Sequence, residues 1–188
     1  MDFSKFKTSD WLKVGGGLGF LIFGFFDWTK VSGFGSSASG NNVFDFFFTG
    51  IIPWILIIGS AVITVLLVTG TMKPGGVPWP VIILAATVLG ALLLLIRLLF
   101  NPLGDEFDVL EGSGIKVGRG IGLWLSAIAG IVAAVGGVLG FQESGGNLND
   151  LKDMNKLKAQ FGGSDGGSAP PPPPPPGMAP PPPPPPAG

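Results

Sequence analysis

The chain has 188 residues and a formal net charge of -1, and 46% of its residues are hydrophobic whereas only 12% are charged. A soluble domain carries about 25% charged residues, so this composition predicts a membrane protein. The chain contains neither cysteine nor histidine, which excludes disulfides, thiolate or imidazole metal ligands and a conventional catalytic triad. It also lacks a basic stripe interleaved with aromatic residues, so we expect no nucleic-acid partner.

Four apolar segments follow one another, and each is long enough for a membrane-spanning helix, which needs about 20 residues. They predict an all-α integral membrane protein with a short N-terminal lead at 1–10 and a four-helix transmembrane bundle at 11–141. The first segment has the basic start and apolar run of a signal peptide, but its FFDW end lacks the small residues of a cleavage site, so we expect a retained helix. The predicted spans are 11–28, 51–70, 77–100 and 121–141.

Tryptophan marks the ends of these segments. Indole rings prefer the headgroup level of a bilayer, and every tryptophan in the chain lies in a first or last turn of a predicted span. The stretch VFDFFFTG at 43–50 either extends the second span or lies in the interface as an aromatic collar, and we favour the collar. The tryptophans are Trp11, Trp28, Trp54, Trp79 and Trp124.

The basic residues predict the orientation of the chain. Four spans place both termini on one side of the membrane, and that side holds seven of the 11 basic residues. By the positive-inside rule we expect both termini to be cytoplasmic. The seven are Lys5, Lys7, Lys13, Lys73, Lys152, Lys156 and Lys158; the opposite side holds Lys30, Arg97, Lys116 and Arg119.

Small residues recur along three of the segments, mostly at intervals of four. In lipid, such a face allows two helix backbones to approach closely. Two interpretations remain open: packing within one compact bundle, or a seam for a homo-oligomer or a larger membrane complex. The candidate packing residues are Gly15, Gly19, Ala86, Gly90, Gly118, Gly122, Ser126, Gly130 and Ala134.

Charged residues near the membrane lie at one predicted boundary, where we place Asp27, Asp45, Arg97 and Arg119. An ion pair of Arg97 with Asp27 or Asp45 would join the helix ends, and snorkelling of Arg97 to the headgroups is the alternative. No ionisable residue falls at mid-membrane, which argues against a transport pathway. Because phosphate-loop and EF-hand motifs are also missing, we predict no catalytic, cofactor-binding or metal-binding residues.

The opening FSKFKTSDWLKVGGGLGFLIFGFFDW resembles that of small four-helix membrane proteins common in actinobacteria, in which a basic lead precedes a glycine-rich first span. The match covers about 30 residues and departs at Asp27, where those proteins have a proline. In architecture, a proline-rich region on four spans is also similar to the actinobacterial 34 kDa antigen-like family. These resemblances imply a bacterial plasma-membrane protein and no particular activity.

The chain becomes polar after Phe141. Apolar residues at helical spacing predict a short amphipathic helix at 147–161, either on the inner leaflet or in a coiled-coil contact. Residues 162–188 then form a glycine hinge and a proline tail, in which Pro170–Pro176 and Pro180–Pro186 flank Met178. Each proline run predicts a polyproline II rod.

Such rods bind the aromatic grooves of recognition domains, or they serve only as spacers. We therefore predict a non-catalytic membrane scaffold or anchor that presents a cytoplasmic proline-rich tail to a soluble polyproline-binding protein. The alternative is an accessory subunit of a transporter, respiratory or cell-envelope complex, packed through its Gly/Ala-rich helix faces.

Overall fold

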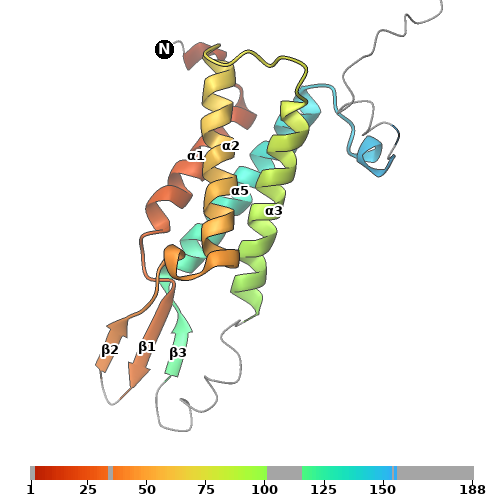
Figure 1. Ribbon diagram of the computed structural model, residues 1–188. Coiled ribbons are helices and arrows are strands. Elements are labelled where there is room, and N and C mark those ends of the chain that lie inside the picture. Colours follow the sequence, from red (N-terminus) through yellow and green to blue (C-terminus); the bar gives the residue numbers. More distant parts are fainter. Residues whose placement is uncertain (1–2, 34–35, 101–115, 154, 156–188) are drawn as a thin grey trace, which may run out of the picture.

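The structure is a computed structural model that describes residues 3–33, 36–100, 116–153 and 155. Its main feature is an up-and-down bundle of four helices (Figure 1). Helix α1 packs against α2 and α5, and α3 packs against the same two neighbours, so the four helices form a closed ring. The helices are α1 (Thr8–Phe23), α2 (Ile52–Val68), α3 (Trp79–Leu99) and α5 (Ile121–Glu143).

Three of these helices are long and apolar enough to cross a membrane. They are Phe47–Val68, Trp79–Leu99 and Ile121–Glu143. The first of them is α2 together with a preceding π-helix, η3 (Phe47–Ile51). Helix α1 has 16 residues and a length of about 24 Å, which is shorter than the about 30 Å hydrocarbon core of a bilayer.

The first helix ends five residues before the predicted limit of 28. Gly24 is its C-cap, and the Gly24 carbonyl accepts a hydrogen bond from the Val43 N–H (3.1 Å). The Trp28 N–H donates to the Asn41 carbonyl (2.7 Å), so the chain has already turned away from the helix axis. The boundaries 11–28 were therefore wrong, because tertiary backbone contacts end a helix that hydropathy alone would continue.

A small antiparallel sheet lies at the end of the bundle opposite the N-terminus (Figure 1). Strand β1 (Thr29–Gly33) is central and pairs with β2 (Ser36–Ser39) and β3 (Lys116–Arg119). The sheet therefore joins the segment after α1 to the segment before α5. The all-α prediction missed it because β1 and β2 lack the alternation of apolar and polar residues that signals a strand.

The segment at 43–50 is helical for most of its length. Asn42 caps a 3-10 turn, η2 (Val43–Asp45), and the π-helix η3 then continues into α2. The second helical stretch thus starts at Phe47, four residues before the predicted start at 51. The segment therefore extends the second helical stretch, the alternative to the interfacial collar that we favoured from the sequence, although the Phe47 and Phe48 rings are exposed.

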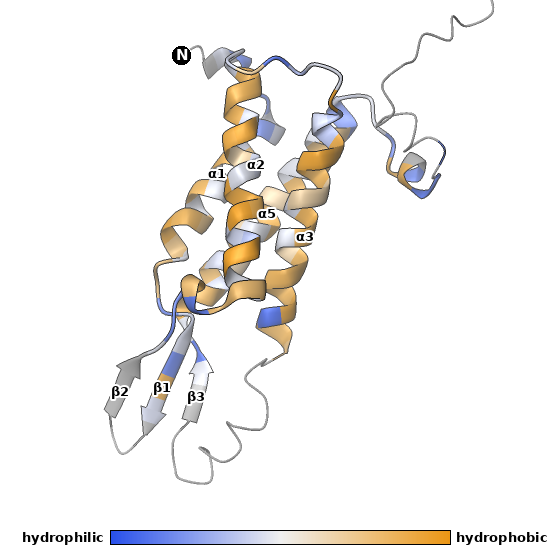
Figure 2. Ribbon diagram, viewed as in Figure 1, coloured by the Kyte–Doolittle hydropathy of each residue, from blue (hydrophilic) through white to orange (hydrophobic). Residues whose placement is uncertain are grey.

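The outer surface of the bundle is apolar. Figure 2 shows hydrophobic residues along all four helices, with hydrophilic residues concentrated in the connections, the helix ends and the sheet. Many large apolar side chains on the helices are exposed, far beyond the patches usual for a soluble monomer. Examples are Leu18, Ile22, Ile55, Val62, Leu89, Leu92, Ile128, Ile131 and Val135.

Several of the predicted small residues lie inside the bundle. Gly90 faces Ile57, Gly122 faces the Phe26 carbonyl and Gly130 faces Leu94, and in each case an added Cβ would come within 3 Å of its neighbour. Gly19 lies near Ala129, and Ser126 is fully buried.

Other candidates in that set are not buried between helices. Gly15 is exposed and an added Cβ would meet nothing within 4 Å, whereas the adjacent Gly16 and Gly17 face α5 and α2. Gly118 belongs to strand β3, so its helical role was wrong. Ala86 and Ala134 are only half-buried. The interval of four drifts off the buried side because the helix has 3.6 residues per turn.

Both ends of the described chain lie at the same end of the bundle, together with the α2–α3 connection (Figure 1). At this terminal end, the 3-10 helix η1 (Phe3–Lys5) precedes α1, and another, η4 (Leu148–Lys152), follows α5. Only the start of the predicted amphipathic helix at 147–161 is described, and it is a 3-10 turn. The tail at 162–188 lies outside the described residues.

Candidate functional site: a polar cavity at the terminal end of the bundle

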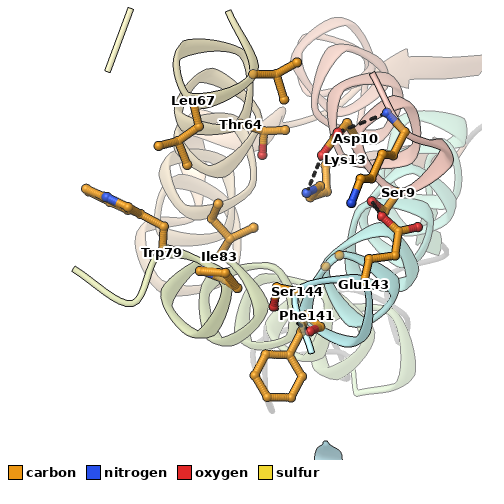
Figure 3. A pocket seen from close by; sticks show the side chains of 15 residues that line it. Ser9, Asp10, Lys13, Thr64, Leu67, Trp79, Ile83, Phe141, Glu143 and Ser144 are labelled. Atoms are coloured by element: carbon orange, nitrogen blue, oxygen red, sulfur yellow. Dashed lines mark hydrogen bonds and ion pairs between the residues drawn. The ribbon is translucent and has the colours of Figure 1, made fainter. Parts of the chain in front are cut away.

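A cavity of about 190 Å³ lies at the terminal end, between the ends of all four helices. Figure 3 shows charged side chains of α1 and α5 on one side of it, and Thr64, Leu67, Trp79 and Ile83 on the other. The up-and-down topology creates this arrangement, because α1 and α3 begin where α2 and α5 end. The cavity therefore combines a charged wall with a mainly apolar wall.

The charged wall begins with an ion pair on α1. The Lys13 ammonium lies 2.8 Å from one Asp10 carboxylate oxygen, and both side chains are largely buried. The other Asp10 oxygen accepts a hydrogen bond from the Lys7 N–H (3.1 Å). An acid in the first helical turn is also favoured by the positive end of the helix dipole. Asp10 is thus held by the backbone and in turn holds the Lys13 ammonium.

A hydrogen bond joins this wall to α5. The Ser9 hydroxyl donates to a carboxylate oxygen of Glu143 (2.7 Å), and Glu143 is the last residue of α5. Ser9 is buried, whereas Glu143 is exposed. The carboxylate therefore keeps a solvent-facing side with which it can accept further hydrogen bonds.

Two glycines of α5 make room for these groups. A Cβ at Gly140 would lie 2.8 Å from the Lys13 ammonium nitrogen, and one at Gly136 would lie 2.9 Å from the Ser9 carbonyl oxygen. A larger residue at Gly136 would push the backbone of α1 away from α5, whereas one at Gly140 would displace the Lys13 ammonium. The close helix approach thus sets the position of the Lys13 ammonium between α1 and α5.

The interfacial charges predicted from the sequence lie at the other end, near the sheet, and they are not brought together as ion pairs among the described residues. The guanidinium carbon of Arg97 lies 3.7 Å from the centre of the Phe46 ring, and Arg97 is buried. The Asp45 carboxylate accepts from the Asn42 N–H (2.7 Å), and Arg119 donates to the Leu99 carbonyl (3.3 Å). For Asp27, it is the backbone carbonyl that accepts, from the Gly122 N–H (3.0 Å).

Tryptophan placement follows the prediction only in part. Trp11 and Trp124 are about half exposed near helix ends, as a headgroup position requires. Trp28 is instead fully buried, with its ring stacked on that of Phe46 at 6.3 Å. This tryptophan is a core residue of the sheet end.

Three hydroxyl groups inside the bundle bond to their own helices, whereas the buried Ser126 hydroxyl has no hydrogen-bond partner among the described residues. Ser60 donates to the Leu56 carbonyl, Thr64 to that of Ser60 and Thr87 to that of Ile83, at 2.7–2.8 Å. This is the usual way to satisfy a hydroxyl in an apolar helix. In the described part of the chain no cluster of three or more His, Cys, Asp or Glu residues could hold a metal ion.

The cavity residues Ser9, Asp10, Lys13 and Glu143 were absent from the predicted sites. The sequence does contain a signal, because Asp10 and Lys13 are three residues apart and such a pair meets on one side of a helix. No local pattern, however, reports that Glu143 lies beside Ser9 across 134 positions.

The fold and the cavity together define a helical membrane protein with three candidate spans, a fourth packed helix and a polar site at the helix ends. No protein-family model, curated protein or solved structure matches the chain.

Proposed function

We propose that the protein is a non-catalytic membrane anchor or scaffold with four spans that presents its proline-rich C-terminal region to a soluble partner. The main observation behind this proposal is the Ser9–Glu143 hydrogen bond, which joins the start of α1 to the end of α5. The residues that follow α5 therefore leave the bundle at a defined place, beside the N-terminus. By the excess of basic residues on that side, the proposal places both termini in the cytoplasm of a bacterial cell.

The burial pattern of α1 supports its role as the fourth span. Its inner side packs against α2 and α5, while Leu18 and Ile22 on its outer side are more than half exposed. An apolar outer side next to the apolar surfaces of α2 and α5 suits a lipid environment. Its shortfall in length against the bilayer is of a size that local thinning accommodates.

The packing of α5 favours the anchor over an accessory subunit. Gly122 and Gly130, the glycines that would serve as a docking face, contact Phe26 and Leu94 of the same chain. These two small residues thus bring this chain's own helices together, which supports the anchor over the accessory subunit.

Deletion of residues 162–188 tests this proposal. The protein is purified from its host membrane in mild detergent, and the soluble proteins bound to the full chain and to the deleted chain are quantified. A matched control replaces each seven-proline run by Gly/Ser of equal length, which keeps the spacer but removes the rigid rods. We expect the same soluble partner to be lost from both variants.

Retention of that partner by the Gly/Ser control would show that the prolines act only as a spacer and would contradict the proposal. Loss of membrane proteins instead of soluble ones would favour the accessory-subunit alternative. A reporter fused after Gly188 checks the orientation, since activity on the outer side of the membrane would contradict cytoplasmic termini.

A further inference from the structure

The polar cavity and an apolar groove occupy neighbouring turns of the same two helices. Lys13 of α1 and Thr64 of α2 line the cavity. Gly17, one turn after Lys13, and Ala61, one turn before Thr64, line a groove of about 230 Å³ between α1 and α2. The lining of this groove has no polar surface. A polar cavity and an apolar groove on neighbouring turns match the polar headgroup and the acyl chain of a membrane lipid.

The depths of the cavity and the groove in the membrane also fit a lipid headgroup and its acyl chain. Trp79 borders the cavity at the first residue of α3, and tryptophan at a helix end marks the headgroup level. The groove extends from that level toward the middle of the bundle, along residues such as Leu18 and Ile58. A headgroup in the cavity would therefore have its acyl chain at groove depth.

The charges of the cavity select among headgroups. Its lining holds two cationic side chains, Lys7 and Lys13, and two carboxylates, Asp10 and Glu143. Asp10 is already paired with Lys13, so a headgroup with a phosphate alone would add a negative charge beside the Glu143 carboxylate and bring no cation to it. One with both a phosphate and a primary ammonium would complement both signs, and its N–H groups would supply donors for a carboxylate.

We propose that the terminal cavity and the α1–α2 groove form a binding site for one phospholipid of the phosphatidylethanolamine type. The phosphate lies near the ammonium groups of Lys7 and Lys13, and the lipid ammonium donates to the exposed side of the Glu143 carboxylate. One acyl chain lies in the α1–α2 groove. The about 190 Å³ of the cavity exceeds more than tenfold the about 10–15 Å³ that one water requires, so a headgroup has room.

A second groove provides an internal comparison. The α3–α5 groove is larger, about 340 Å³, and is lined only by apolar residues such as Leu92 and Val135. Neither groove shares a lining residue with the polar cavity, but α1, which lines only the α1–α2 groove, carries Lys13 and follows directly on Lys7. Lipid held in the α3–α5 groove would be ordinary annular lipid without preference for a headgroup, so the two grooves separate selective from nonselective binding.

Native mass spectrometry of the delipidated full chain tests the proposal. The protein in mild detergent is titrated separately with phosphatidylethanolamine, phosphatidylcholine and phosphatidylglycerol of identical acyl chains. Phosphatidylcholine keeps the charges but lacks N–H donors, and phosphatidylglycerol lacks the cation. We expect one phosphatidylethanolamine per chain to be retained about tenfold more tightly than either other lipid, the effect of one charge-assisted hydrogen bond.

Variants at exposed positions assign the site without disturbing the core. Val62→Trp fills the α1–α2 groove and should abolish selective retention, while Val135→Trp in the other groove should leave it unchanged, since both valines are exposed. Glu143→Gln should reduce the preference for phosphatidylethanolamine over phosphatidylglycerol about tenfold. Its control Asp153→Asn, an exposed acid outside the cavity lining, should not.

Equal retention of the three lipids by the full chain would overturn the proposal. It would also fail if Val135→Trp releases the lipid as completely as Val62→Trp, because binding would then be annular. Thermal unfolding of each variant without lipid verifies that the bundle is intact. These outcomes do not depend on whether the proline tail binds a partner.

Discussion

The two ends of the bundle are closed in different ways. At the sheet end, Trp28 is fully buried and its ring contacts those of Phe20 and Phe46. Arg97, the buried cation that the structure describes at this end, lies against the face of the Phe46 ring. At the terminal end, the buried cation Lys13 is paired with a carboxylate beside a cavity. Aromatic packing fills the first end, while the second leaves space between charged groups.

Helix α5 contributes glycine to both ends, but the neighbours of these glycines differ. Near the sheet, the N–H groups of Gly120, the N-cap of α5, and of Gly122 donate to the carbonyls of Trp28 and Asp27 (2.8 and 3.0 Å), so one backbone holds another. Near the termini, Gly136 and Gly140 make room for Ser9 and Lys13. The backbone contacts near the sheet hold two segments of this chain together. Near the termini, the exposed Glu143 carboxylate can accept further hydrogen bonds, so this end can also bind a ligand. This difference fits a structural role of the sheet end and the lipid site that we propose at the terminal end.

The largest effect is expected where both ends depend on one contact. Gly16 of α1 faces the backbone of α5, and an added Cβ would lie 2.6 Å from the Ala133 nitrogen. Gly16→Leu must therefore separate the two helices and should cost about 3 kcal/mol or more of the free energy of unfolding. Reversible unfolding in mixed SDS micelles measures the change.

The adjacent glycine supplies the control for this variant. A Cβ added at Gly15 would meet no atom within 4 Å, so Gly15→Leu should leave the stability equal or raise it slightly through better helix propensity. Equal destabilisation by Gly15→Leu and Gly16→Leu would contradict the α1–α5 packing. It would also contradict the arrangement of the sheet end and the terminal end, which both depend on that packing.

Removal of the buried ring tests the sheet end alone. Trp28→Ala should cost about 3 kcal/mol of the free energy of unfolding, since it leaves a cavity beside Phe20 and Phe46. Trp124→Ala, at a position about half exposed, should cost well under half as much. A lipid titration of Trp28→Ala should still show the selectivity of the terminal cavity, and loss of selectivity would show that the two ends are coupled.

The sequence predicted the apolar helices well because their signal is local. Three long runs of apolar residues coincide with the three candidate spans to within about two residues at most ends, and only the start of the second differs more, since Phe47 enters the helix through a π-turn. Hydropathy, however, does not register a hydrogen bond between distant parts of the backbone. The Val43–Gly24 and Trp28–Asn41 backbone hydrogen bonds end α1, and no residue pattern within 11–28 predicts them.

The candidate site escaped prediction for a similar reason. Lys13 counted in the sequence only as a basic residue for orientation, and its burial arises because Gly136 and Gly140 admit α1 close to α5. Arg97 was expected to pair with Asp27 or Asp45, but the π-turn at Phe47 places the Phe46 ring beneath it instead. Side-chain partners across helices depend on rotation about each helix axis, which a period of four residues does not fix.

An intermediate effect is expected from the buried ion pair. Lys13→Gln leaves the Asp10 carboxylate buried without its cation and should cost about 2 kcal/mol of the free energy of unfolding. The double variant Asp10→Asn with Lys13→Gln removes both charges and should be more stable than the single variant. If the double variant is the less stable of the two, the pair does not interact as the 2.8 Å distance indicates.

The smallest effect is expected at the bond between α1 and α5. Ser9→Ala removes the hydroxyl that donates to Glu143, and because that carboxylate is exposed and can accept from water instead, the loss should be only about 0.5 kcal/mol. The stability of Ser9→Ala combined with Glu143→Gln should then equal that of Ser9→Ala alone. A local readout is more sensitive: amide hydrogen exchange in the last turn of α5 should accelerate in Ser9→Ala, while exchange in strand β1 stays unchanged. Acceleration in β1 as well would mean that the terminal end also supports the sheet, against the separate roles assigned to the two ends.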